Sequence, residues 1–152
     1  MELFDKQVKH YTDKYNELKK VFEKRDYAVI AKTLGVEDVK EAFKKNDDTF
    51  EKFVLAYANV MPGKVSCTAY AAAVARICDD NGIKYKVYTG FCEPKNFVKY
   101  KTDKKTYNER KKKGEKHPMF PTHVYLETED KKIYEYYNGE KDIDHIDVVE
   151  IA

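Results

Sequence analysis

Residues 66–82 read SCTAYAAAVARICDDNG, and the rest of the chain is organised around this stretch. Alanine and arginine favour a helix, and Asn81-Gly82 predicts where it ends, because glycine tolerates the left-handed conformation common at helix C-termini. A Pro-Gly pair at positions 62–63 interrupts whatever precedes it. We therefore expect Cys67 in the first turn of the helix, where unpaired backbone N–H groups and the helix dipole favour a thiolate over a thiol.

This stretch alone leaves two interpretations of Cys67 open. A free cysteine is most often a small buried apolar residue. A cysteine at the head of a buried helix is also how a nucleophile is placed. The helix has a small-residue surface that allows close packing, formed by Ala69, Ala71, Ala72, Ala73 and Ala75.

Composition sets the outer limits. A chain of 152 residues predicts one domain, residues 1–152, with a real core. The 42% of apolar residues exclude wholesale disorder, and a net charge of +2 is too small to indicate nucleic-acid binding by itself. No apolar run is long enough to span a membrane, and the N-terminus does not resemble a signal peptide.

The cysteine count predicts the compartment. Three cysteines are an odd number, and their spacing is not that of a metal site. Reduced thiols in a cytoplasmic protein are therefore expected rather than a disulfide framework, and we expect no metal and no cofactor.

The first part of the chain, residues 1–61, has the periodicity of helices. One apolar stripe at spacings of three and four predicts a long amphipathic helix and consists of Phe4, Val8, Tyr11, Tyr15, Leu18 and Phe22. Shorter helices are expected over residues 27–34, 37–45 and 50–61, the last capped by Asp48 or Thr49.

After Gly82 the period changes to that of strands. Alternating apolar and polar residues predict strands over residues 83–89, 122–128, 133–138 and 147–151. Helices followed by antiparallel strands indicate an α+β domain, with the Cys67 helix packed on a small sheet. Residues 62–152 would form this core.

The hairpin formed by the second and third of these strands brings polar residues together. A two-residue loop at Asp130-Lys131 would place His123 opposite Asn138, whose side chain could then orient the imidazole. A three-residue loop would instead place Tyr137 opposite His123. A histidine and an asparagine with ordinary hydrogen bonds at strand ends remain the plainer interpretation.

Residues 92–121 form a long insertion rich in lysine, with tyrosine and phenylalanine interleaved. Insertions of this length often form lids or binding loops. Residues 95–113 could bind nucleic acid or an acidic protein, or they could be a solvated loop.

Together, Cys67 at the head of a helix, GIKYKVYTGF at 82–91 and THVYLETEDKKIYEYYNG at 122–139 resemble the core of transglutaminase-like cysteine enzymes, a branch of the papain-like superfamily. The family has a cysteine heading a central helix, a histidine strand beginning H-x-W/Y-x-E, and a following strand that ends in Asp or Asn. Here Tyr125 stands where the family often has Trp. The family usually has a glycine one or two places before the cysteine, whereas here Val65 and Ser66 occupy those places and the preceding glycine is Gly63.

The resemblance implies a papain-like or transglutaminase-like core in which Cys67 is the nucleophile, His123 the base and Asn138 the residue that orients it. It implies cysteine-dependent acyl transfer through a thioester on a protein or peptide substrate, as a protease or amidase or as a transglutaminase. Two alternatives are an inactive member of the same fold that binds proteins, and a nucleic-acid or acidic-partner binder that uses the basic insertion.

Overall fold

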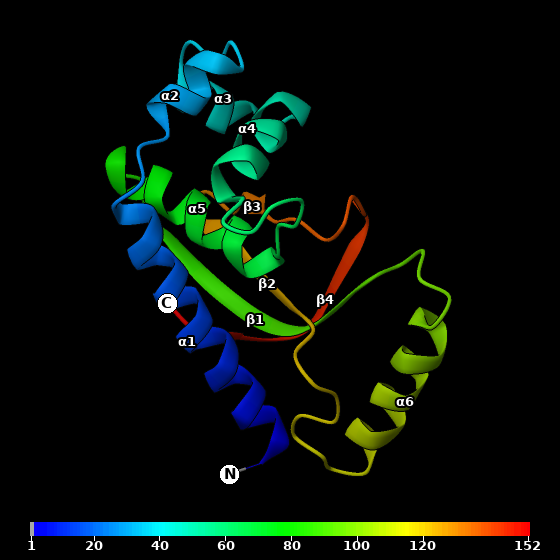
Figure 1. The fold of residues 1–152 in the computed structure, drawn as a ribbon. Helices are drawn as coiled ribbons and strands as arrows, with labels where there is room; N and C mark the ends of the chain where they lie inside the picture. The colour runs from blue at the N-terminus through cyan, green and yellow to red at the C-terminus, as the bar shows by residue number, and fades with distance from the viewer. Residues whose placement is uncertain (1) are drawn as a thin grey trace.

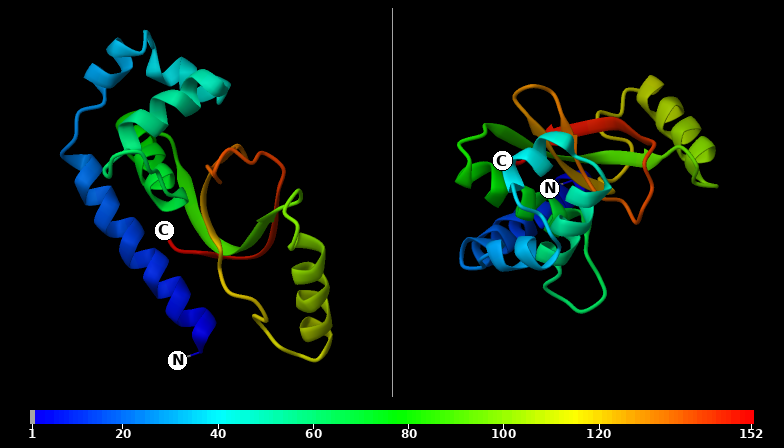
Figure 2. Two further views of the ribbon diagram at one scale, coloured as in Figure 1. Left: turned by 45° about the vertical axis from the view of Figure 1, so that its right-hand side comes forward. Right: turned by 90° about the horizontal axis from the view of Figure 1, so that it is seen from above.

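A computed structural model describes residues 2–152 (Figures 1 and 2). The helices come first and the strands follow, interrupted by one further helix, so the architecture is α+β. In chain order the elements are α1 Leu3–Glu23, α2 Ala28–Thr33, α3 Val39–Lys45, α4 Asp48–Ala58, α5 Cys67–Asp80, β1 Tyr85–Pro94, α6 Tyr100–Lys112, β2 His123–Thr128, β3 Ile133–Tyr134 and β4 Ile143–Glu150.

The N-terminal helices confirm the predicted periodicity. The buried residues of α1 are Phe4, Tyr15, Leu18 and Phe22, which belong to the predicted apolar stripe. Helix α4 is capped by Asp47, one residue before the expected Asp48 or Thr49, because the Asp47 side chain accepts hydrogen bonds from the Thr49 and Phe50 amides. It also ends at Ala58, three residues before the predicted end at residue 61.

Helix α5 lies at the centre of the molecule. It packs against α1, α4 and β2, and its alanines are almost wholly buried (Figure 1). Small side chains allow this because neighbouring elements can approach the helix axis closely. The α5 helix thus links the helical part of the chain to the sheet.

The sheet has four antiparallel strands in the order β3-β2-β1-β4. Strand β1 is longer than predicted, because its second half pairs with β4. Strands β1 and β4 lie so close together that position 90 requires a glycine, because a Cβ atom there would lie 2.0 Å from the carbonyl oxygen of Asp147. Strand β4 begins at Ile143 rather than at residue 147, and β3 is only two residues long rather than six.

The basic insertion contains a helix that was not predicted. Helix α6 stands beside the end of the sheet, on loops that connect it to β1 and β2 (Figures 1 and 2). It is attached by Tyr107, which stacks on Phe91, and by Tyr100, which donates a hydrogen bond to Asp144. Within residues 2–152, no helix combines the length and apolar character needed to cross a membrane.

Candidate functional site

Cys67 is the first residue of α5, as predicted. The side chain of Ser66 caps the helix by accepting a hydrogen bond from the Ala69 amide at 3.1 Å. This cap leaves the Cys67 N–H among the unpaired amides of the first turn. The Cys67 side chain is partly exposed, whereas the neighbouring residue Thr68 is buried.

His123 begins β2, and its side chain is fully buried. Its Nε2 atom lies 2.8 Å from Oε1 of Glu135. Its other ring nitrogen, Nδ1, is buried and has no partner that satisfies hydrogen-bond geometry. Because Nε2 is engaged by Glu135, Nδ1 is the nitrogen available to the Cys67 thiol.

The Cys67 thiol and the His123 ring interact, as the pKa of each group indicates. Burial alone would raise the pKa of Cys67, but hydrogen bonding to His123 and the charge on its ring outweigh burial and lower it. Burial would lower the pKa of His123, yet Cys67 and Glu135 raise it to about 9.

Glu135 lies just after β3 and was not among the predicted site residues. Burial would raise its pKa, but hydrogen bonds to His123 and His145 lower the pKa to about 2. The carboxylate is therefore ionised at neutral pH and can hold the His123 ring in one orientation and stabilise an imidazolium.

Asn138 does not occupy the place expected for it. The hairpin pairs Leu126 with Tyr134 and Glu127 with Ile133, which requires a three-residue loop at 129–131 rather than two residues. Lys131 takes a positive φ of 70° in this loop, a conformation that three-residue hairpin loops require. Asn138 is exposed in a turn, so the expected contact between Asn138 and His123 is replaced by the contact with Glu135.

The hairpin forms with the second of the two registers considered, in which Tyr137 lies opposite His123. Tyr137 packs its ring against His123 with ring centroids 4.8 Å apart. Continued outward, this register places Glu135 opposite Tyr125, on the same face as His123. A three-residue loop already implies an acidic residue, Glu135, beside His123, and this is the signal in the sequence that points to Glu135.

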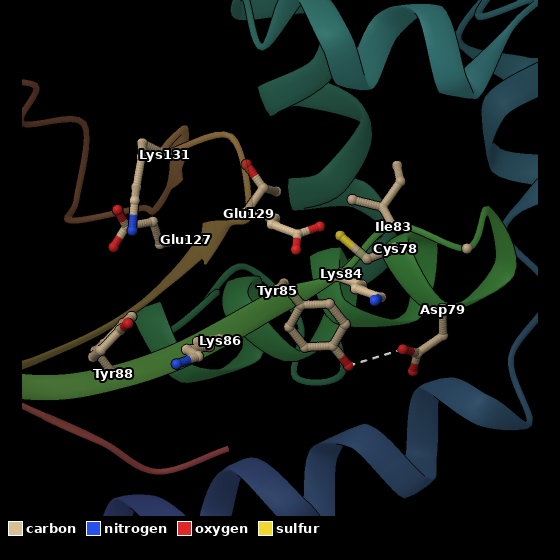
Figure 3. A pocket seen from close by; sticks show the side chains of 12 residues that line it. Cys78, Asp79, Ile83, Lys84, Tyr85, Lys86, Tyr88, Glu127, Glu129 and Lys131 are labelled. Carbon is tan, nitrogen blue, oxygen red and sulfur yellow. Dashed lines mark hydrogen bonds between the residues drawn. The ribbon is translucent and has the colours of Figure 1, made fainter.

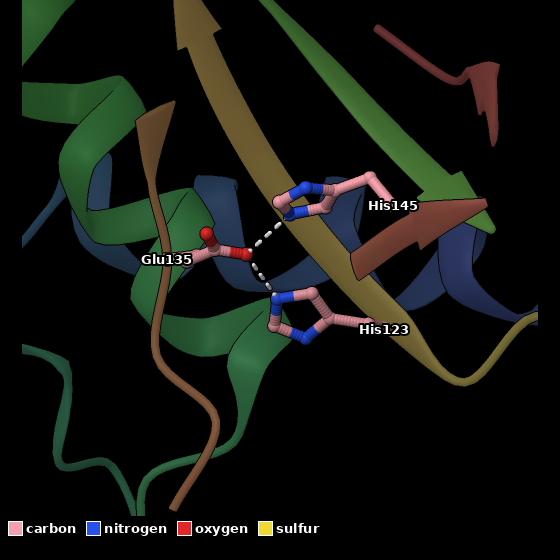
Figure 4. A group of neighbouring side chains, drawn as sticks. All are labelled: His123, Glu135 and His145. Carbon is pink, nitrogen blue, oxygen red and sulfur yellow. Dashed lines mark hydrogen bonds and ion pairs between the residues drawn. The ribbon is translucent and has the colours of Figure 1, made fainter. Parts of the chain in front are cut away.

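His145, which the sequence analysis did not single out, belongs to the same cluster. It lies on β4, and its Nε2 atom is 2.8 Å from the same Oε1 atom of Glu135 (Figure 4). Its ring packs on Tyr125 with centroids 4.4 Å apart. His145 was not recognised because β4 begins four residues earlier than its sequence pattern indicates.

The same three side chains are the described residues that could hold a metal ion. The ligand atoms of His123, Glu135 and His145 all lie within 4.8 Å of one another. No other group of histidine, cysteine, aspartate and glutamate in residues 2–152 meets this condition. Imidazole nitrogen and carboxylate oxygen are ligands that zinc accepts.

The remaining cysteines and a large cavity lie elsewhere. Cys78 and Cys92 are buried, and burial raises the pKa of Cys78 to about 12. The cavity has a volume of about 780 Å³ and is lined by Cys78, Tyr85 and Lys131, among others (Figure 3). It lies at the far end of α5 and β2 from Cys67 and His123, so it is not the site of the cysteine–histidine pair.

The site is therefore a buried histidine between the cysteine that begins α5 and an ionised glutamate, with a second histidine on that glutamate. Comparisons of the chain with protein-family models, with curated proteins and with solved structures found no match.

Proposed function

We propose that this chain is a cysteine-dependent enzyme that transfers an acyl group from an amide substrate through a thioester. Cys67 is the nucleophile, His123 the general base and acid, and Glu135 the residue that orients His123. We also propose that the core is transglutaminase-like, with a cysteine helix packed on neighbouring antiparallel strands that carry the histidine and the acid.

The observation that carries this proposal is the position of His123 between Cys67 and Glu135. A nucleophile, a base within reach of it and a third group that orients the base form the arrangement used in nucleophilic catalysis. Here the three side chains come from α5, β2 and the end of β3. Glu135 fixes Nε2 of His123, so Nδ1 is directed to the thiol.

The reaction then follows from these groups. His123 takes the proton of Cys67, and the thiolate attacks the carbonyl carbon of the amide. The Cys67 N–H donates to the developing oxyanion, since it is an unpaired amide of the first helical turn. The tetrahedral intermediate collapses when His123 gives its proton to the leaving amine, which leaves a thioester on Cys67.

The thioester is then resolved by a second nucleophile. Water attacks it with His123 as general base, which releases a carboxylic acid and restores the thiol. An amine in place of water gives transamidation. Hydrolysis is the default because water is always present, and the substrate is an amide of a protein or peptide.

Selective alkylation tests this proposal without a known substrate. Iodoacetamide at pH 7, followed by peptide mass spectrometry, measures the rate at each cysteine separately. We expect Cys67 to react at least about tenfold faster than Cys78, because a thiolate is the reactive form and burial disfavours it at Cys78. The His123→Ala variant should lose most of this advantage.

His10→Ala is the matched control, because His10 is exposed on α1 and outside the cluster. It should leave the rate at Cys67 unchanged. Equal rates at Cys67 in the wild type and the His123→Ala variant, both no faster than free cysteine, would exclude the enzyme and leave a binding module.

One observation favours a second function, binding of an anionic partner by the basic insertion. Helix α6 exposes Lys101, Lys105 and Lys112, which share one face because they are spaced by four and seven residues. Nucleic acid is the partner that we propose, since its phosphates attract such a face. Fluorescence anisotropy with labelled single-stranded DNA measures this binding.

A further inference from the structure

We propose that His123, Glu135 and His145 form a binding site for a divalent ion of the zinc type, and that occupancy of this site switches the Cys67 thiol off. The binding site stands on its own geometry. Only the second part, the switch, rests on the proposed function.

The ligand atoms already converge on one point. Figure 4 shows both rings directed at the same oxygen of the Glu135 carboxylate, the His145 ring from above and the His123 ring from below in this view. Each Nε2 atom is 2.8 Å from Oε1, and all three ligand atoms fall within 4.8 Å of one another. Tetrahedral zinc, with bonds of about 2.0–2.1 Å, separates its ligands by about 3.3 Å, so each Nε2–Oε1 distance of 2.8 Å must widen slightly to admit the ion.

The three ligands are held by different parts of the sheet. His123 begins β2, Glu135 follows β3, and His145 lies on β4 beside Cys92 of β1. The His123 ring is also packed against Tyr137, and the His145 ring against Tyr125. Ligands fixed in this way lose little conformational freedom when an ion binds, which favours affinity.

An ion can reach the site from solvent. The side chains of Glu135 and His145 are 18% and 19% exposed, whereas that of His123 is fully buried. Glu135 also lines a cavity of about 200 Å³ on the helical side of the sheet. The other residues around this cavity are Asn46, Asp47, Asp48, Glu51, Tyr70, Ile133 and Lys141.

The cavity favours cations. Asp47, Asp48 and Glu51 contribute three carboxylates, and Lys141 neutralises one of them through its ion pair with Glu51 at 2.8 Å. The remaining negative charge raises the local concentration of divalent ions next to Glu135. A zinc ion held by three protein ligands takes a water molecule as its fourth ligand.

The buried Nδ1 atom of His123 fits the same site. A histidine that binds a metal through one ring nitrogen donates the N–H of the other nitrogen to a nearby acceptor. At His123 that second nitrogen is Nδ1, which has no regular hydrogen-bond partner and faces the thiol. The sulfur of the protonated Cys67 thiol would accept from it, so His123 Nδ1 is paired in the metal-bound form.

Ion binding and catalysis exclude each other. A neutral imidazole with a metal on Nε2 carries its proton on Nδ1 and has no lone pair left to take the proton of Cys67. The ion also takes the Glu135 carboxylate that stabilises the imidazolium. The proposed enzyme is therefore inactive while the ion is bound and recovers when a chelator removes it.

Cobalt binding tests the site without any substrate. The full chain is freed of metal with a chelator and titrated with Co²⁺, which is followed by its visible absorption. We expect one ion per chain in the wild type, and an affinity lower by at least about a hundredfold in the His145→Ala variant. His10→Ala is the control and should bind like the wild type.

Two further variants make the outcome decisive. Cys67→Ser should bind Co²⁺ normally and the wild type should show no thiolate-to-metal absorption band, because Cys67 is not a ligand. If His145→Ala unfolds, His145→Gln keeps a polar side chain and should still bind much more weakly than the wild type. Wild-type affinity in the His145 variants, or loss of binding in Cys67→Ser, would overturn the site.

The switch has its own readout. Zn²⁺ should slow alkylation of Cys67 by at least about tenfold in the wild type and leave its rate in the His145→Ala variant unchanged relative to metal-free buffer. Tight Co²⁺ binding with an unreactive Cys67 would retain the site and reject the proposed enzyme. A reactive Cys67 with no Co²⁺ binding would retain the enzyme and reject the site.

Discussion

Glu135, three residues before Asn138, occupies the place beside His123 that the sequence suggested for Asn138. A single carboxylate oxygen receives two imidazoles, His123 and His145, each at 2.8 Å. The sequence could supply the residue types but not this pairing, because the choice between Glu135 and Asn138 depends on one residue in the length of the hairpin loop.

At this scale we predict that Glu135→Gln lowers the alkylation rate of Cys67 at pH 7 by at least about tenfold. The amide has no charge to stabilise the His123 imidazolium, so less Cys67 is present as thiolate. Asn138→Ala is the matched control and should react like the wild type, because Asn138 is exposed in a turn. A larger effect at Asn138 would restore the role that the sequence suggested for it.

Glu93 gives a prediction of stability. Burial, and after it the charge of Asp103, raise the pKa of this carboxyl group, which accepts a hydrogen bond from Tyr137 at 3.4 Å. A raised pKa in the folded state means that the native protein binds the proton more tightly than the unfolded chain. Stability therefore falls as pH rises from the unfolded pKa through the folded one.

Glu93→Gln removes this loss because the amide is neutral at every pH and still accepts from Tyr137. We expect the variant to have a Tm a few degrees above the wild type at pH 7 and close to it at pH 4, measured by calorimetry. A variant that is less stable at pH 7 would show that the Glu93 charge is favourable in the fold.

At the scale of elements, the strands β1 and β4 depend on one backbone contact. A Cβ atom at position 90 would lie 2.0 Å from the Asp147 carbonyl oxygen and 2.7 Å from the Val148 Cα atom. Both neighbours are backbone atoms, so neither can rotate away.

Gly90→Ala should therefore destabilise the protein by more than about 3 kcal/mol, measured by urea unfolding. Gly35→Ala is the control: its φ is positive at 74° but nothing lies within 4 Å of the added atom, so it should cost only about 1 kcal/mol. Equal losses in the two variants would mean that β4 can shift away from β1 at little cost.

Helix α6 could not be predicted from the sequence because it has too few apolar residues to form a periodic pattern. Its buried residues, Tyr100 and Tyr107, are two turns apart, and the positions between them are mainly polar. Two aromatic residues do not make a detectable apolar stripe. The stacking of Tyr107 on Phe91 and the contact of Tyr100 with Asp144 depend on β1 and β4, which are distant in the sequence.

At the scale of the whole molecule, the charges are divided between two regions. The mouth of the cavity beside Glu135 is acidic, whereas the exposed face of α6 is basic. The net charge of +2 conceals this division, because it sums over both regions.

Replacing Lys101, Lys105 and Lys112 with Gln should weaken binding of single-stranded DNA and reduce its salt dependence, measured by fluorescence anisotropy. The reason is that a protein with fewer lysines neutralises fewer phosphates and so releases fewer counterions from the DNA. Alkylation of Cys67 should be unchanged, since these lysines lie on α6 outside the cluster. DNA affinity equal to that of the wild type would show that the basic face does not bind nucleic acid.

The sequence by itself determined the features that depend on neighbouring residues. These are the stripe of α1, the cap and start of α5 that place Cys67, and the strand that begins at His123. Each is fixed by side-chain periodicity or by a hydrogen bond within a few residues, so it can be recognised without knowing the rest of the fold.

Only the tertiary structure decided which partners surround His123. Glu135 and His145 come from segments 12 and 22 positions further along the chain, and both reach His123 through the hairpin register and through the pairing of β1 with β4. A shift of one residue in either would turn these side chains to the other face of the sheet. The pattern of a short strand does not specify its register, which is set by packing against α5 and by the polar contacts of the buried imidazole.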